Sequence, residues 1–104
     1  MAYVVKILPR AQRDLEELFE EIRVQHSEAS LVWYAGLTKA MFSLDEHPNR
    51  CPIVRKRDQL RHLLYSQRPN VYRILFRVLE EQHSVEVLHI RHGAKEEVKP
   101  AGLV

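Results

Sequence analysis

The chain has 104 residues, of which 45% are apolar and 29% are charged, and its 16 Lys and Arg exceed its 14 Asp and Glu by two. This balance excludes a disordered tail and a membrane protein, and the length predicts one domain, residues 1–104, in which residues 94–104 form a loose polar tail. The single cysteine, Cys51, excludes an internal disulfide and indicates the reducing cytosol. The apolar start is interrupted by Lys6 and stops at Pro9, unlike a signal peptide.

The first half of the chain predicts a strand followed by two helices. Residues 2–8 are rich in strand-forming side chains, and Pro9 ends the run. Residues 10–25 carry apolar side chains at helical spacing, namely Leu15, Leu18, Phe19 and Ile22. A second apolar stripe predicts a helix over residues 28–46, and it consists of Trp33, Leu37, Ala40, Met41 and Leu44. The short connection between the helices predicts an antiparallel hairpin, which a proline-bracketed loop follows.

The second half changes to the spacing of strands. Residues 61–66, 71–79 and 84–92 read as three strands joined by polar turns, which predicts an antiparallel meander. In the last strand the apolar pattern shifts phase at Val87–Leu88, so this strand is either central and buried on both faces or carries a bulge. The chain is therefore predicted to be an α+β fold of order β-α-α-β-β-β, in which the helix hairpin packs on one face of a small antiparallel sheet.

Positive charge is concentrated in residues 50–77, which hold eight basic side chains against Asp58 alone. Such a block attracts a polyanion or an acidic protein segment, although a solvated basic face is the simpler alternative. Apolar side chains alternate with arginines along residues 71–79, so the apolar face should pack under the helices while Arg73 and Arg77 point to the open side. The candidate anion-binding residues are Arg55, Lys56, Arg57, Arg61, Arg73, Arg77 and Arg91.

The histidines and the cysteine suggest little metal chemistry. His89 and His92 are three residues apart, which places them on opposite faces of a strand, and we expect neither a metal nor a cofactor. His92 stands at a strand end, where it could act as a general acid or base or could simply be hydrogen-bonded to the backbone. Nothing beside Cys51 would activate a thiol, so we expect it to be inert.

Three segments resemble the RelE/ParE superfamily of toxins from type II toxin–antitoxin systems. They are YVVKILPRAQRDLEELFEEI with its A-x-x-D-L pattern, the loop from Pro48 to Pro52 with RHLLYSQRPNVYRILFRV after it, and VEVLHIRHGAKE at the last strand. The resemblance covers residues 3–97 and implies the same fold. It also implies a cytoplasmic growth inhibitor that a cognate acidic antitoxin neutralises by laying a helix or strand along its groove. The candidate antitoxin-binding residues are Leu15, Phe19, Trp33, Leu37 and Arg73.

The superfamily implies two possible targets. RelE-like members cleave mRNA on the ribosome without a metal, and for that activity the candidate catalytic residues are Arg73, Arg77, Lys56 and His92. ParE-like members instead poison DNA gyrase and are not nucleases. The tail after His92 has no tyrosine, whereas many nuclease members stack a base on a C-terminal aromatic residue, and the exit HGAKE resembles ParE-like and plasmid-stabilisation members. The resemblance therefore favours the gyrase poison, with the RelE-like endoribonuclease as the alternative.

Overall fold

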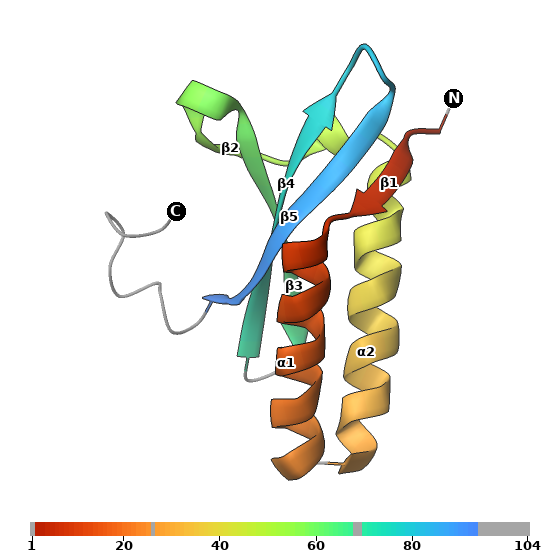
Figure 1. The fold of residues 1–104 in the computed structure, drawn as a ribbon, viewed down its shortest axis with the longest axis vertical. Coiled ribbons are helices and arrows are strands. Elements are labelled where there is room, and N and C mark those ends of the chain that lie inside the picture. The colour runs from red at the N-terminus through yellow and green to blue at the C-terminus, as the bar shows by residue number, and fades with distance from the viewer. Residues whose placement is uncertain (1, 26, 68–69, 94–104) are drawn as a thin grey trace.

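The computed structural model describes residues 2–25, 27–67 and 70–93, so the predicted tail, residues 94–104, lies outside the described residues. A β-α-α-β-β-β core is present, with one further short strand (Figure 1). The strands are β1 (Val4–Ile7), β2 (Ile53–Arg55), β3 (Leu60–Gln67), β4 (Asn70–Leu79) and β5 (Ser84–His92), and the helices are α1 (Pro9–Gln25) and α2 (Ser27–Phe42). Three 3₁₀ turns are η1 (Ser43–Asp45), η2 (Pro48–Arg50) and η3 (Lys56–Asp58).

The strands form one mixed sheet of order β1-β5-β4-β3-β2. The predicted antiparallel meander β3-β4-β5 is confirmed, and it is extended at both edges. β1 pairs in parallel with β5, from Val4 opposite Ser84 to Ile7 opposite Val87, whereas β2 pairs antiparallel with the start of β3. The prediction of a purely antiparallel sheet was therefore wrong at β1.

The second helix is shorter than predicted, because the α-helix ends at Phe42 and a 3₁₀ turn follows it. The hydroxyl of Ser43 donates a 2.6 Å hydrogen bond to the carbonyl of Ala40, so this side chain satisfies an acceptor of the last helical turn. Leu44, predicted as the last apolar residue of the helix, is fully buried within η1.

Both helices cover the same face of the sheet, and the core lies between them and the strands (Figure 1). Tyr72, Ile74 and Phe76 of β4 point into this core, as the alternation of apolar residues predicted. On the helix side the core is filled by Ala11, Leu15, Trp33, Leu37, Met41 and Leu44. None of the described helices is long and apolar enough to cross a membrane.

The expected irregularity in the last strand is a β-bulge in a central strand. Leu75 of β4 pairs with His89, whereas the next residue, Phe76, pairs with Val87. Leu88 is therefore an extra residue in β5, and it shifts the apolar pattern from one face to the other. The bulge allows both Val87 and Ile90 to point into the core.

Beyond the end of β1, a side chain of α1 takes over the hydrogen bonding along the edge of β5. The amide of Leu8 donates to the carbonyl of Val87, and the chain then turns into α1. One turn further on, Asp14 Oδ2 accepts a 3.1 Å hydrogen bond from the amide of Ile90, while Asp14 Oδ1 lies 3.2 Å from Nε of Arg10. The A-x-x-D-L pattern thus has a structural cause, because Ala11 and Leu15, one turn before and one residue after Asp14, both pack into the core.

Candidate functional site

The sheet face turned away from the helices carries a cluster of basic side chains, which we call the distal cluster and define as His62, Arg73, His89 and Arg91. Strand register builds it: Arg73 lies between Leu64 and Arg91 on the neighbouring strands, and the adjacent row places His62 and His89 on either side of Leu75. Side chains of directly paired residues share a face, so the cluster is one surface. Sequence reasoning missed His62 and His89 as members, because only the register brings them together.

Arg73 points away from the helices as predicted, but it is only 4% exposed. Its aliphatic stem lies across Gly93 at the end of β5, where an added Cβ would come within 2.8 Å of Cγ of Arg73. The glycine of the HG motif therefore leaves room for this side chain. Arg73 is accordingly a packed residue of the sheet face rather than an exposed cation.

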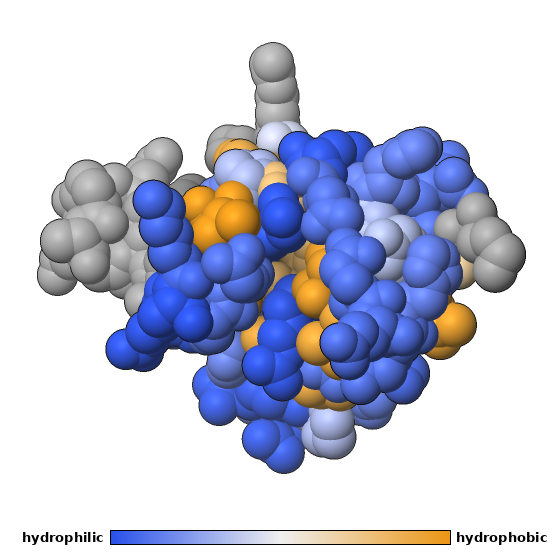
Figure 2. All heavy atoms as spheres, turned by 90° about the horizontal axis from the view of Figure 1, so that it is seen from above, coloured by the Kyte–Doolittle hydropathy of each residue, from blue (hydrophilic) through white to orange (hydrophobic). Residues whose placement is uncertain are grey.

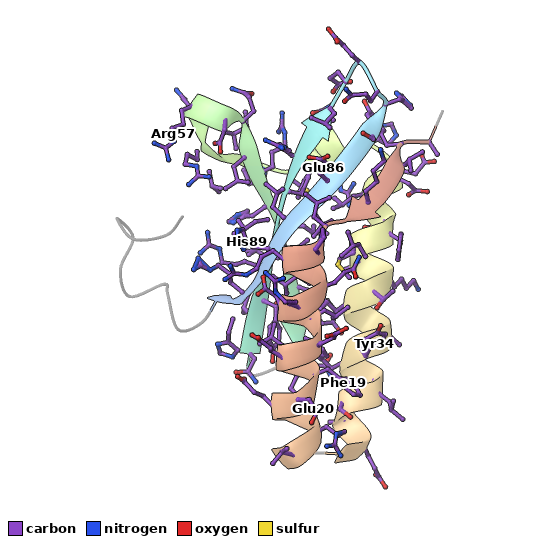
Figure 3. All side chains as sticks on the ribbon, in the orientation of Figure 1. Phe19, Glu20, Tyr34, Arg57, Glu86 and His89 are labelled. Carbon is purple, nitrogen blue, oxygen red and sulfur yellow. The ribbon has the colours of Figure 1, made fainter. Side chains whose placement is uncertain are left out.

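Two carboxylates partly neutralise the positive charge of the distal face, one beside Arg77 and one beside His89. Arg77 is exposed, and its Nε lies 3.1 Å from a carboxylate oxygen of Glu86, the residue paired with it on β5. His89 lies at the opposite margin, and its Nδ1 is 3.6 Å from Oδ2 of Asp14. Figure 3 shows Glu86 and His89 at separate levels of β5.

A basic arm projects from the sheet edge, and it consists of β2 and η3, residues 53–58. Arg55 makes two hydrogen bonds to the carboxylate of Asp58, of 3.0 and 2.9 Å, and this pairing lowers the pKa of Asp58. The ion pair fixes the turn and leaves Lys56 and Arg57 exposed at the tip. Figure 3 shows Arg57 pointing away from the body of the molecule, and Figure 2 shows hydrophilic side chains over most of the face seen from above.

Two predicted site residues lie on the helix side of the sheet instead. Arg61 pairs with the core residue Phe76, and its guanidinium donates to the carbonyls of Asn49 and Cys51 in the loop after α2. It therefore holds a loop and is not available as part of the distal surface. Arg61 and Arg73, both named as candidate anion-binding residues, therefore lie on opposite faces of the sheet.

His92 is the second of these residues. It pairs with Tyr72, its Nε2 lies 2.8 Å from Oδ1 of Asn70, and its ring packs edge-on against Tyr72. His89 and His92 lie on opposite faces, as predicted, and His92 therefore lies on the face opposite Arg73. No group of three or more metal-binding side chains occurs within residues 2–25, 27–67 and 70–93, and burial raises the pKa of the Cys51 thiol.

Comparison with known proteins identifies the family of the chain. A family model described as the ParE toxin of the type II toxin–antitoxin system parDE matches residues 5–97. This chain belongs to the ParE toxin family. None of the curated proteins compared with it gives a match.

The fold of this toxin also occurs in solved toxin–antitoxin structures. The chromosomal ParDE system of Pseudomonas aeruginosa matches with a TM-score of 0.73 and 18% identity, over 88% of this chain and 96% of that chain. The RelBE2 complex of Mycobacterium tuberculosis matches with 0.61 and 24%, over 88% and 92%. The RelBE complex of Escherichia coli matches with 0.59 and 20%, over 88% and 96%. These likenesses show the common fold of ParE and RelE toxins.

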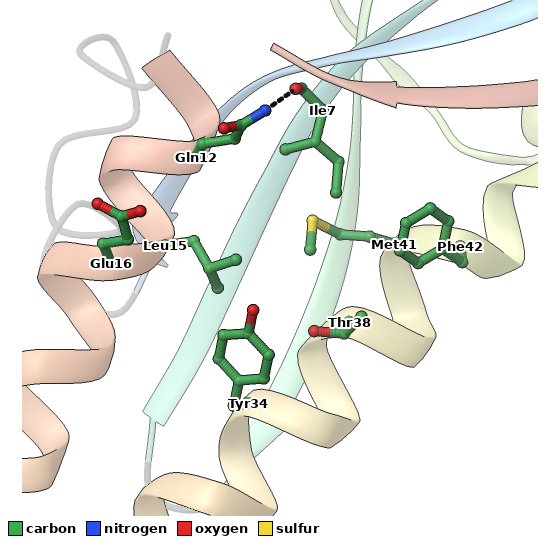
Figure 4. A pocket seen from close by; sticks show the side chains of 8 residues that line it. All are labelled: Ile7, Gln12, Leu15, Glu16, Tyr34, Thr38, Met41 and Phe42. Carbon is green, nitrogen blue, oxygen red and sulfur yellow. Dashed lines mark hydrogen bonds between the residues drawn. The ribbon is translucent and has the colours of Figure 1, made fainter. Parts of the chain in front are cut away.

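The residues of this toxin that we expected to bind an antitoxin are mainly core residues. Trp33 and Leu37 are fully buried against the sheet. Leu15 is almost buried but lies at the base of a cleft of about 330 Å³ between α1 and α2, beside Tyr34 and other residues drawn in Figure 4. Phe19 is half-buried and packs edge-on against Tyr34, with ring centroids 5.5 Å apart. Of the five predicted residues, Phe19 is the most exposed, followed by Leu15 at this cleft, while Arg73, Trp33 and Leu37 are buried.

The position of His62 beside Arg73 in the distal cluster leads to a testable prediction about the pKa of His62. Burial lowers the pKa of His62, and the neighbouring positive charge of Arg73 lowers it further. In the toxin with Arg73→Gln, we therefore expect the NMR titration midpoint of His62 to move upward toward the ordinary value near 6.5. Because the folded state lowers the pKa of His62, its contribution to stability is present above the unfolded pKa and is lost as the pH falls from that value through the lowered folded pKa. An unchanged midpoint would mean that the two side chains do not interact.

Proposed function

We propose that this toxin arrests growth by binding DNA gyrase, as ParE-like toxins do, rather than by cleaving RNA. One observation carries the proposal: the four side chains that we named as candidates for RNA cleavage are spread over the two faces of the sheet and the projecting arm. Arg73 is packed into the distal face, Arg77 is paired with Glu86, and His92 lies on the other side of the sheet. The fourth, Lys56, stands on the projecting arm.

The chemistry of metal-free RNA cleavage explains why this separation matters. Attack of a 2′-hydroxyl on the adjacent phosphate needs a general base within hydrogen-bond reach and cations beside the same phosphate. His92, the base named from the sequence, lies on the face opposite Arg73, so these two side chains do not face a common phosphate; the histidines beside Arg73 are His62 and His89 of the distal cluster. Inhibition by binding has no such requirement, because separate surfaces can contact a large target independently.

In this proposal, the protein that binds and neutralises the toxin is an acidic antitoxin. The basic block of residues 50–77 and the exposed tip of the arm, Lys56 and Arg57, match the charge of such a segment. The cleft beside Leu15 and Phe19 offers the apolar part of the same docking surface. The antitoxin would then neutralise the toxin by covering the arm and the cleft, so that gyrase cannot contact them.

The deciding experiment combines purified toxin, DNA gyrase, ATP and supercoiled plasmid. We expect cleaved plasmid to accumulate after denaturation of the protein, and addition of the antitoxin should prevent it. Topoisomerase IV, assayed in the same way, tests whether the effect is specific for gyrase. Unchanged supercoiling at saturating toxin would refute the gyrase proposal.

RNA cleavage is tested in parallel in cells. After toxin induction, primer extension on translated messages should show no new 5′ ends, while markers of DNA damage should rise. New 5′ ends inside codons, without DNA damage, would instead identify the RelE-like endoribonuclease.

A further inference from the structure

Helix α2 is apolar on both sides, although only one side packs against the sheet. Its inner side contributes Trp33, Leu37 and Met41 to the core. Its outer side exposes Leu31 and Val32, at 68% and 62%, and Phe42 at 47%. The outer side of α1 is rich in charged residues by comparison. A helix with apolar residues all round ordinarily has a second packing partner.

Five of the exposed residues of α2 form one continuous seam. Glu28, Val32, Ala35, Lys39 and Phe42 follow one another at intervals of four, three, four and three residues, and all five are exposed. This is the spacing of the contact positions in a coiled coil, where two helices pack along a single stripe. Leu31 flanks the stripe, and the small Ala35 stands at its centre, where two helices could approach closely.

The charges of the seam select the orientation of a partner helix. Glu28 lies in the first turn of α2 and Lys39 in the last turn. In an antiparallel pair that crosses at Ala35, each Glu28 lies within one helical turn of Lys39 of the other copy. A parallel pair would place like charges opposite each other, which is unfavourable. The seam is thus complementary to itself under a two-fold axis.

We propose that the outer face of α2 is a homodimer interface, which pairs with the same face of a second copy of this chain in antiparallel orientation. An acidic antitoxin segment fits this face less well, because the seam has one acidic and one basic residue, the basic block lies elsewhere, and of the five seam residues only Phe42 also lines the cleft assigned to the antitoxin. The contact is limited to one helix face, so the dimer is expected to be weak and to depend on concentration. The proposal is independent of the identity of the toxin's target.

Sedimentation equilibrium of the purified full-length toxin tests the proposal. We expect the average mass to rise from one chain toward two as the concentration increases. Ala35→Arg should remain monomeric because it places a bulky charge at the crossing point, and its exposed position leaves the fold intact. Val24→Arg is the matched control, since Val24 is 75% exposed but lies on α1 outside the seam; it should dimerise as the wild type does.

A charge exchange identifies the interface and its orientation. Glu28→Lys should raise the dissociation constant about tenfold or more, because two-fold symmetry repeats each unfavourable contact. Adding Lys39→Glu to the same chain should restore the original value. A toxin that stays monomeric at every concentration, or a dimer that Glu28→Lys leaves unchanged, would overturn the proposal. Protection of α2 from hydrogen exchange solely in the antitoxin complex would overturn it in favour of the antitoxin.

Discussion

Replacing Asp14 by alanine is expected to lower the free energy of unfolding by about 2 kcal/mol, because the amide of Ile90 then loses its acceptor. Ile90 is buried, and β1 does not extend far enough to supply another carbonyl. A buried amide without a partner costs more than an average hydrogen bond contributes. Urea denaturation followed by circular dichroism measures the change.

Two further variants separate the Asp14 hydrogen bond from helix effects. Asp14→Asn retains a side-chain carbonyl and should lose less stability than Asp14→Ala. Glu17→Ala removes an exposed carboxylate from the same helix and should change stability by less than about 0.5 kcal/mol. Equal losses in Asp14→Ala and Glu17→Ala would show that the contact with β5 is unimportant.

Trp33→Ala should destabilise the toxin more than Asp14→Ala does, with a loss of about 3–5 kcal/mol. Trp33 is 1% exposed and packs edge-on against Tyr72, with ring centroids 5.4 Å apart. Such a loss is a large part of the roughly 5–15 kcal/mol that stabilises a typical domain. Since Trp33 is the single tryptophan, unfolding of the variant is followed by circular dichroism rather than by its fluorescence.

This variant also distinguishes a core residue from an antitoxin contact. If Trp33 is a core residue, antitoxin affinity and stability should fall together. Val24→Ala, at an exposed position of α1, should leave the stability within about 0.5 kcal/mol. A stable Trp33→Ala toxin that merely binds its antitoxin poorly would instead place Trp33 in the interface.

Local patterns were sufficient to predict most elements of the fold. The helices are visible as apolar stripes, and the bulge at Leu88 is visible as a phase shift. The parallel pairing of β1 with β5 was not predictable, because nothing in residues 4–7 indicates which distant strand they join. β2 was missed because three residues, Ile53–Arg55, are too few to show alternation.

For the candidate site, the sequence predicted which face of the sheet a side chain occupies, but not which other side chains it contacts. Alternation along β4 placed Arg73 and Arg77 on the correct side of the sheet. The burial of Arg73 and the pairing of Arg77 with Glu86 depend on neighbouring strands, as does the position of Arg61 on the helix side. The HG motif was recognised, but the space that Gly93 provides for Arg73 is a three-dimensional property.

The parallel pairing of β1 with β5 has a consequence for biosynthesis. Val4 pairs with Ser84, 80 positions further along the chain, so the sheet edge cannot close until Ser84 and the strand that contains it have left the ribosome. Contacts between such distant segments carry a large loop-closure entropy and slow the final folding step. The nascent chain therefore lacks its finished sheet until β5 has been synthesised, so a complete folded surface is available to a partner only after that point.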